Sequence, residues 1–139
     1  MTTIITDAGF AGEDWPYNFV SLEDLAANDA GPTVSVDLPS DADPDALADR
    51  LADIDMIRVD FPSFADGRGF TIARRLRLMG YTGRLRARGH VIADQYAMAR
   101  RSGFDEVEID ADLAARQPED QWRARANWQA HSYQNRLRA

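Results

Sequence analysis

Arg68 stands at the centre of the segment best suited to binding chemistry, with Gly67 and Gly69 on either side. Asp60 and Asp66 precede it, where a strand is expected to end and a helix to begin. The glycines would let the backbone approach a ligand closely, and the helix start would offer unpaired N–H groups to an anion. A sulfate-like, phosphate-like or carboxylate group would fit. In the structural alternative, Asp66 caps the helix and Arg68 pairs with Asp60 or Asp66.

Further candidates follow the other expected strands. Arg74 and Arg86 would add bidentate hydrogen bonds to the same oxyanion. His90 and Asp94 stand one helical turn apart, as in a general base oriented by a carboxylate, although such a pair more often caps a helix. The ligand candidates among these residues are Asp60, Asp66, Gly67, Arg68, Gly69, Arg74, Arg86 and Asp94, with Asp37, His90 and Asp110 as secondary candidates.

Composition excludes most redox and metal chemistry. The chain has no cysteine, which removes disulfides, iron–sulfur clusters, thiolate zinc sites and thiol nucleophiles. All sixteen basic residues are arginine, so neither a Schiff-base lysine nor a P-loop lysine is present. Asp37, Asp60 and Asp110 could together hold Mg²⁺, but aspartates at loop starts are commonly turn residues. We predict no metal and, because no nucleotide or flavin fingerprint occurs, no cofactor.

Charge is distributed unevenly along the 139 residues, whose net charge is −7. Residues 1–65 carry 14 acids and 2 arginines, whereas residues 66–101 carry 9 arginines and 2 acids. The basic stretch predicts a small anion or an acidic partner surface, unless the two halves neutralise each other across the fold. The net charge argues against nucleic acid. No signal peptide or membrane span is expected, which predicts a cytoplasmic protein.

The expected elements that position these residues form one α/β domain. Strands are expected over residues 3–6, 33–38, 56–61, 84–88 and 107–110, and helices over residues 22–28, 44–51, 69–79, 91–102 and 118–137. Residues 1–32 would form an N-terminal β arm and short helix, and residues 33–139 the main domain with a C-terminal helix. About four parallel strands in βα repeats would give either a partial-barrel-like sheet or a doubly wound open sheet. Exposed sheet edges would favour a homo-oligomer.

Two features support this arrangement and the place of the site. Residues 36–43 and 59–66 match at six of eight positions, as consecutive βα units of a barrel-like sheet would. Parallel α/β folds place their working face at the carboxyl ends of the strands. Those ends carry Asp37, Asp60, His90 and Asp110, so the site is expected there.

Four segments carry a resemblance to a known bacterial family: residues 61–74, 80–89, 94–95 and 101–105. They resemble the domain-of-unknown-function family numbered 934. Members are typically encoded beside assimilatory sulfite reductase and adenylyl-sulfate reductase genes, and some carry an oxidoreductase label. The resemblance therefore implies a role in sulfate assimilation. The sequence departs from the family pattern at Arg84, Arg88, His90 and Ala93. The positions that match are the segment from Asp66 to Gly69, Arg86, Asp94, Gln95 and Arg101, so the resemblance adds Gln95 and Arg101 to the ligand candidates.

Three function classes follow. The first is an accessory protein of sulfate or sulfite reduction that contacts sulfite reductase or another sulfate-assimilation enzyme, or presents an oxyanion. The second is a small enzyme that uses Asp60, Asp66 and Arg68 on an anionic substrate. The third is a structural or regulatory subunit. Without cysteine or a cofactor motif, an oxidoreductase label is best interpreted as a pathway association.

Overall fold

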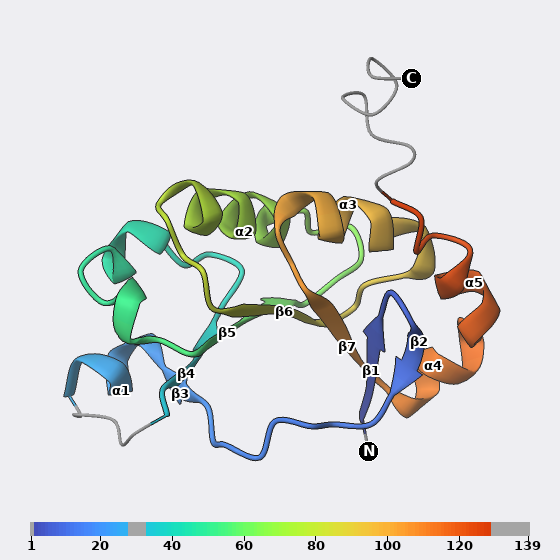
Figure 1. The fold of residues 1–139 in the computed structure, drawn as a ribbon, viewed down its shortest axis with the longest axis horizontal. Coiled ribbons are helices and arrows are strands. Elements are labelled where there is room, and N and C mark those ends of the chain that lie inside the picture. Colours follow the sequence, from blue (N-terminus) through green and yellow to red (C-terminus); the bar gives the residue numbers. More distant parts are fainter. Residues whose placement is uncertain (1, 28–32, 129–139) are drawn as a thin grey trace.

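Seven strands form one mixed sheet in the computed structural model, which describes residues 2–27 and 33–128 (Figure 1). The strands are β1 (Thr2–Thr6), β2 (Gly9–Ala11), β3 (Val20–Ser21), β4 (Ser35–Leu38), β5 (Met56–Phe61), β6 (Arg84–Gly89) and β7 (Glu106–Asp110). They lie in the order β2-β1-β7-β6-β5-β4-β3. Strands β3 to β7 pair with one another in parallel, and β1 is antiparallel to both β2 and β7. The predicted α/β class and the N-terminal β arm are confirmed.

Helices or 3-10 turns connect the parallel strands, and two further helices follow β7. The helices are α1 (Leu22–Ala27), α2 (Arg68–Leu78), α3 (Tyr96–Ser102), α4 (Ala111–Arg116) and α5 (Glu119–Arg123), with 3-10 turns η1 (Pro44–Leu47), η2 (Leu51–Asp53) and η3 (Ala93–Gln95). Figure 1 shows α2 and α3 over one face of the sheet. From β3 to β7 the spatial order follows the chain order, so this part of the sheet has no reversal of strand order.

Two helix predictions need correction. The segment expected as one helix over residues 44–51 forms η1 and then η2. Its buried residues, Pro44 and Leu47, are three positions apart, so one tight turn is enough to bury both. The helix expected over residues 118–137 ends at Arg123. Its buried anchor, Trp122, lies within a single turn of Pro118, and residues 129–137 lie outside the described part of the chain. Helix α4 was not expected.

The two faces of the sheet differ in chemistry. Because side chains alternate along a strand, the face under α2 and α3 takes the apolar residues. It carries Val36, Ile57, Val59, Leu85, Ala87 and Val107, all at most 1% exposed. The opposite face takes the charged residues of the same strands, and an extended segment from residue 12 to residue 19 crosses it between β2 and β3 (Figure 1).

Candidate functional site

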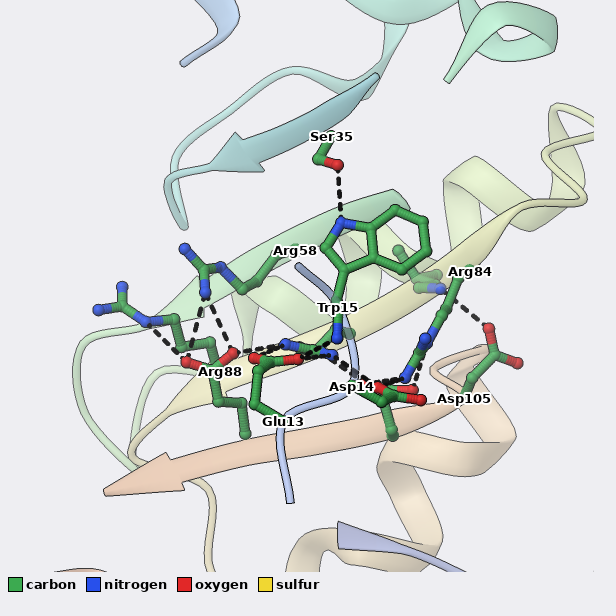
Figure 2. Close-up of polar contacts among 12 residues, drawn as sticks. Glu13, Asp14, Trp15, Ser35, Arg58, Arg84, Arg88 and Asp105 are labelled. Atoms are coloured by element: carbon green, nitrogen blue, oxygen red, sulfur yellow. Dashed lines mark hydrogen bonds and ion pairs between the residues drawn. The ribbon is translucent and has the colours of Figure 1, made fainter. Parts of the chain in front are cut away.

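The charged face of the sheet carries an ion-pair cluster. Arginines on β5 and β6 meet carboxylates from β4, β5, β7 and the crossing segment. Figure 2 shows Glu13 and Asp14 of the crossing segment beside these arginines. We use the name ion-pair cluster for these ten residues: Arg58, Arg84, Arg86, Arg88, Glu13, Asp14, Asp37, Asp60, Glu106 and Glu108. The cluster arises because β6 places arginines at alternate positions beside the alternate acids of β7, and parallel pairing brings them side by side.

Arg86 is the centre of the cluster and is 0% exposed. Its Nε donates to Glu106 at 2.6 Å, and its terminal nitrogens donate to Glu108 at 2.8 Å and to Glu13 at 2.7 and 3.0 Å. Burial by itself lowers the pKa of Arg86. The hydrogen bonds and negative charges of Glu13, Glu106 and Glu108 have the larger effect, so the pKa is raised above its usual value. Arg86 therefore stays charged while fully enclosed.

Two neighbouring arginines are paired as tightly. Arg58 donates to Asp37 at 2.6 and 2.8 Å and to Glu108 at 3.1 Å. Arg84 donates to Glu106 and to Asp14, each at 2.6 Å. No buried side-chain nitrogen or oxygen within residues 2–27 and 33–128 lacks a hydrogen-bond partner. Arg58, Arg84 and Arg86 are thus neutralised by carboxylates of the same chain, as expected if the basic and acidic parts of the sequence pair with each other in the fold.

A cavity opens at the carboxyl ends of β5, β6 and β7, where the sequence predicts the site. Its volume is about 280 Å³, and Phe61, Pro62, Ile109 and Leu113 give it apolar walls. The polar side chains are those of Thr2, Asp60, Arg88, His90, Glu108, Asp110 and Arg116. We call this space the carboxyl-end cavity. Three of the four residues expected at the strand ends line it, whereas Asp37 instead pairs with Arg58.

Arg88 differs from the other arginines of the cluster. Its closest carboxylate contacts are 3.5 Å to Glu108 and 3.9 Å to Asp60, and its side chain is 49% exposed. Hydrogen bonds need donor–acceptor distances near 2.9 Å, so the Arg88 guanidinium keeps donors for another acceptor. Glu108 is already bound by Arg58 and Arg86, which explains why Arg88 lies farther from it.

Two further charged side chains, those of Asp110 and Arg116, line the cavity, so it contains both acidic and basic groups. The Asp110 carboxylate accepts the Leu113 amide at 2.8 Å and so caps α4, the role typical of an aspartate at a helix start. Arg116, on the last turn of α4, brings a second guanidinium to the cavity. No cluster of three or more potential metal-ligating side chains occurs in the described chain. The arrangement can bind a small polar molecule that carries an anionic group.

In the loop around Arg68, the arginine pairs with Asp66, one of the two partners expected for it if the loop has a structural role. The Arg68 side chain donates to Asp66 at 2.8 and 3.0 Å and to Ser40 at 2.9 Å. Hydrogen bonds from the Arg68 side chain and amide hold the pKa of Asp66 well below its usual range. A Cβ at Gly69 would overlap the Phe61 ring, so this glycine allows α2 to pack closely on β5. Arg68 remains 60% exposed.

The structure separates the remaining candidates from the cavity. Gln95 accepts the Ile92 amide and donates to the Phe64 carbonyl at 2.7 Å, which links η3 to the loop after β5. Asp94 pairs with Arg125 at 2.7 Å. Arg101, on α3, donates to the Trp128 carbonyl, and Arg74 is exposed on α2. Arg86 lies in the ion-pair cluster instead of at a ligand.

Sequence reasoning missed Arg88, Arg116, Glu13 and the glutamates of β7 as parts of one site. One signal was available for two strands: alternate arginines in residues 84–88 and alternate acids in residues 106–110 have the period of a strand and opposite signs. Nothing in the sequence gives the partner of Glu13, which is 73 residues away from Arg86.

Comparison with known proteins defines the family. Residues 35–139 match the family model described as "Bacterial protein of unknown function (DUF934)", and the chain belongs to this family. The matched part includes β4 to β7 and therefore the carboxyl ends that line the cavity. Comparisons with curated proteins and with solved structures gave no match. None of the helices in the described residues has the length and apolar character needed to cross a membrane.

Proposed function

We propose that this protein is an accessory protein of assimilatory sulfate and sulfite reduction that binds a small oxyanion in the carboxyl-end cavity. One observation carries the oxyanion part: Arg88 faces the cavity with its carboxylate contacts at 3.5 and 3.9 Å, while the other cluster arginines are paired at 3.1 Å or less. The pathway part is supported by the resemblance described above. Sulfite reductase or another sulfate-assimilation enzyme would be the protein partner.

The chemistry of the cavity fits this ligand class. A guanidinium offers a planar fork of donors that matches two oxygens of a sulfate, sulfite or carboxylate group. Arg116 would add a second fork from α4. Asp60 and Glu108 are the acids nearest Arg88, so a ligand anion must compete with them, and this favours modest affinity and rapid exchange.

A second candidate function is a small enzyme that acts on an anionic substrate at the same strand ends. It is favoured by the presence of His90 and Asp60 in one cavity with Arg88, since an imidazole and a carboxylate are the usual proton-transfer groups. Asp66 and Arg68, the other residues expected in such a site, contact Ser40 near the end of β4.

The proposal also includes a partial-barrel-like sheet and self-association. The consecutive order of β3 to β7 supports the former. The edge strands β2 and β3 are 3 and 2 residues long and offer little backbone for pairing between copies. A homo-oligomer would therefore use side-chain surfaces.

Isothermal titration calorimetry with sulfate and sulfite tests the ligand. We expect binding heat for the wild-type protein and a loss of about ten- to one-hundred-fold in affinity for Arg88→Gln, the effect of removing a charge-assisted hydrogen bond. Arg68→Ala is the matched control and should bind as the wild type does. If Arg68→Ala abolishes binding instead, the ligand lies at the start of α2. Absence of heat in the wild type with both anions would refute oxyanion binding.

A further inference from the structure

Residues 12–19 form a segment, here called the strap, that crosses the charged face of the sheet between β2 and β3 (Figure 1). Within the described chain, no backbone hydrogen bond joins the strap to the strands that it crosses. Its contacts with the sheet are made by side chains. The strap therefore lies on the sheet as a bound peptide would, without being a strand of it.

The strap contacts three places on the sheet. Glu13 accepts two hydrogen bonds from Arg86, and Asp14 accepts one from Arg84 at 2.6 Å. The Trp15 indole donates to the Ser35 hydroxyl on β4 at 2.8 Å, as Figure 2 shows. The Trp15 ring also lies 5.5 Å from the Arg84 guanidinium.

A second aromatic contact extends the strap toward β5. The Phe19 ring lies 3.7 Å from the Arg58 guanidinium, a cation–π distance. The sheet thus holds two adjacent acids and two aromatic rings of one extended segment.

The charge count shows that the sheet does not need the acids of the strap. Four arginines of the cluster come from the sheet, and the sheet itself supplies four acids: Asp37, Asp60, Glu106 and Glu108. Glu13 and Asp14 add two negative charges beyond this balance. They occupy the outward-facing N–H groups of Arg84 and Arg86, which the β7 glutamates leave available.

The strap is also loosely held for a segment that covers a fully buried arginine. Six of its eight residues are exposed, and the side chains of Glu13 and Asp14 are 36% and 65% exposed. Local opening of the strap exposes the guanidiniums of Arg84 and Arg86 without breaking the sheet.

We propose that the sheet surface beneath the strap is a docking surface for an acidic segment of a partner protein, with two adjacent acids followed by an aromatic residue, and that the strap is its built-in competitor. An extended peptide, and not a small anion, fits because the anchoring points run from β6 to Ser35 on β4. This inference rests on the accessory role proposed above, for which it names the chemistry of the partner. The docking surface does not include Arg88, which lines the carboxyl-end cavity.

A peptide with the sequence of residues 11–19, labelled at its N-terminus, tests the proposal by fluorescence anisotropy. We expect Glu13→Gln/Asp14→Asn, whose own strap is weakened, to bind the peptide at least ten-fold more tightly than the wild type. The same peptide with Gln and Asn in place of the two acids should not bind. Adding Arg84→Gln to the double variant should weaken binding at least ten-fold.

The outcomes separate this proposal from the proposed function. The docking surface is overturned if the folded double variant does not bind the acidic peptide, or if it binds the neutral peptide equally well. This holds even if calorimetry shows that the protein binds sulfate. If calorimetry shows no binding of sulfate or sulfite but the peptide still binds, only the oxyanion site is overturned.

Discussion

Replacement of Arg86 by Met tests whether the ion-pair cluster holds the fold together. The guanidinium is 0% exposed, and the side chains of Glu106 and Glu108 beneath it are 5% and 4% exposed. Met fills much of the space of the arginine stem but gives these carboxylates no donor. Removing one partner of a buried ion pair costs about 3–5 kcal/mol, because it leaves buried charge without compensation.

The contacts place the expected loss at the lower end of that range. Glu106 keeps Arg84 at 2.6 Å, and Glu108 keeps Arg58 at 3.1 Å, so each carboxylate retains one donor. We therefore expect Arg86→Met to lower the free energy of unfolding by about 3 kcal/mol, a large share of the roughly 5–15 kcal/mol typical of a domain. Because Glu106 contacts Arg86 directly, Arg86→Met and Glu106→Gln should be non-additive by about 1–3 kcal/mol.

Urea unfolding followed by circular dichroism measures these free energies at pH 7. Arg88→Gln is the matched control, since it removes a β6 arginine that is 49% exposed, and it should change stability by less than about 0.5 kcal/mol. A loss below about 1 kcal/mol for Arg86→Met, or strict additivity with Glu106→Gln, would refute the reasoning that the cluster is a coupled buried network.

Three further predictions concern the strap and the α3 region. Partial burial raises the pKa of Glu13, but hydrogen bonds from Arg86 and from the Trp15 amide leave it below the usual 4.5; the stability that Glu13 provides is thus complete above about pH 4.5 and is lost as the pH falls through the lowered pKa. The free energies of unfolding of the wild type and Glu13→Gln, measured in urea, should therefore differ at pH 7 and converge as the pH falls below 4.5, and a difference that stays constant with pH would contradict this. Tyr96→Phe removes a 2.5 Å hydrogen bond to Asp7 and should cost about 1 kcal/mol in the same assay, with an unchanged midpoint as the contrary result. Trp122 is 1% exposed, so Trp122→Ala leaves a cavity and should lower the free energy of unfolding by about 3–5 kcal/mol. A smaller decrease than that of Tyr96→Phe would show that α5 does not anchor the domain.

Local patterns account for the parts of the fold that the sequence predicts well. The five expected strands all form, with boundaries shifted by two residues at most, because each combines β-prone apolar residues at alternate positions with turn residues on its flanks. The convergence of Asp60, His90 and Asp110 follows from parallel pairing, which brings strand ends to one edge. Arg116 could not be placed in this site without α4.

Local geometry accounts for the contacts within the Arg68 segment. Asp66 and Arg68 are two residues apart, so their fork of hydrogen bonds needs no tertiary contact. Glu13, in contrast, reaches Arg86 only because the strap crosses the sheet. That path depends on where β1 and β3 lie, at opposite ends of the strand order apart from the short β2, and no property of residues 12–19 specifies it.

The order of distances around Glu108 connects the buried cluster with the cavity. Its carboxylate meets Arg86 at 2.8 Å, Arg58 at 3.1 Å and Arg88 at 3.5 Å. A carboxylate has a limited number of acceptor positions, so the fully buried Arg86 and the largely enclosed Arg58, whose side chain is 15% exposed, take the short contacts. The Arg88 side chain is half exposed, so it can hydrogen-bond to water, and it lines the carboxyl-end cavity. Burial of its neighbours is therefore the physical reason that, of the cluster arginines, Arg88 is the one available to a ligand.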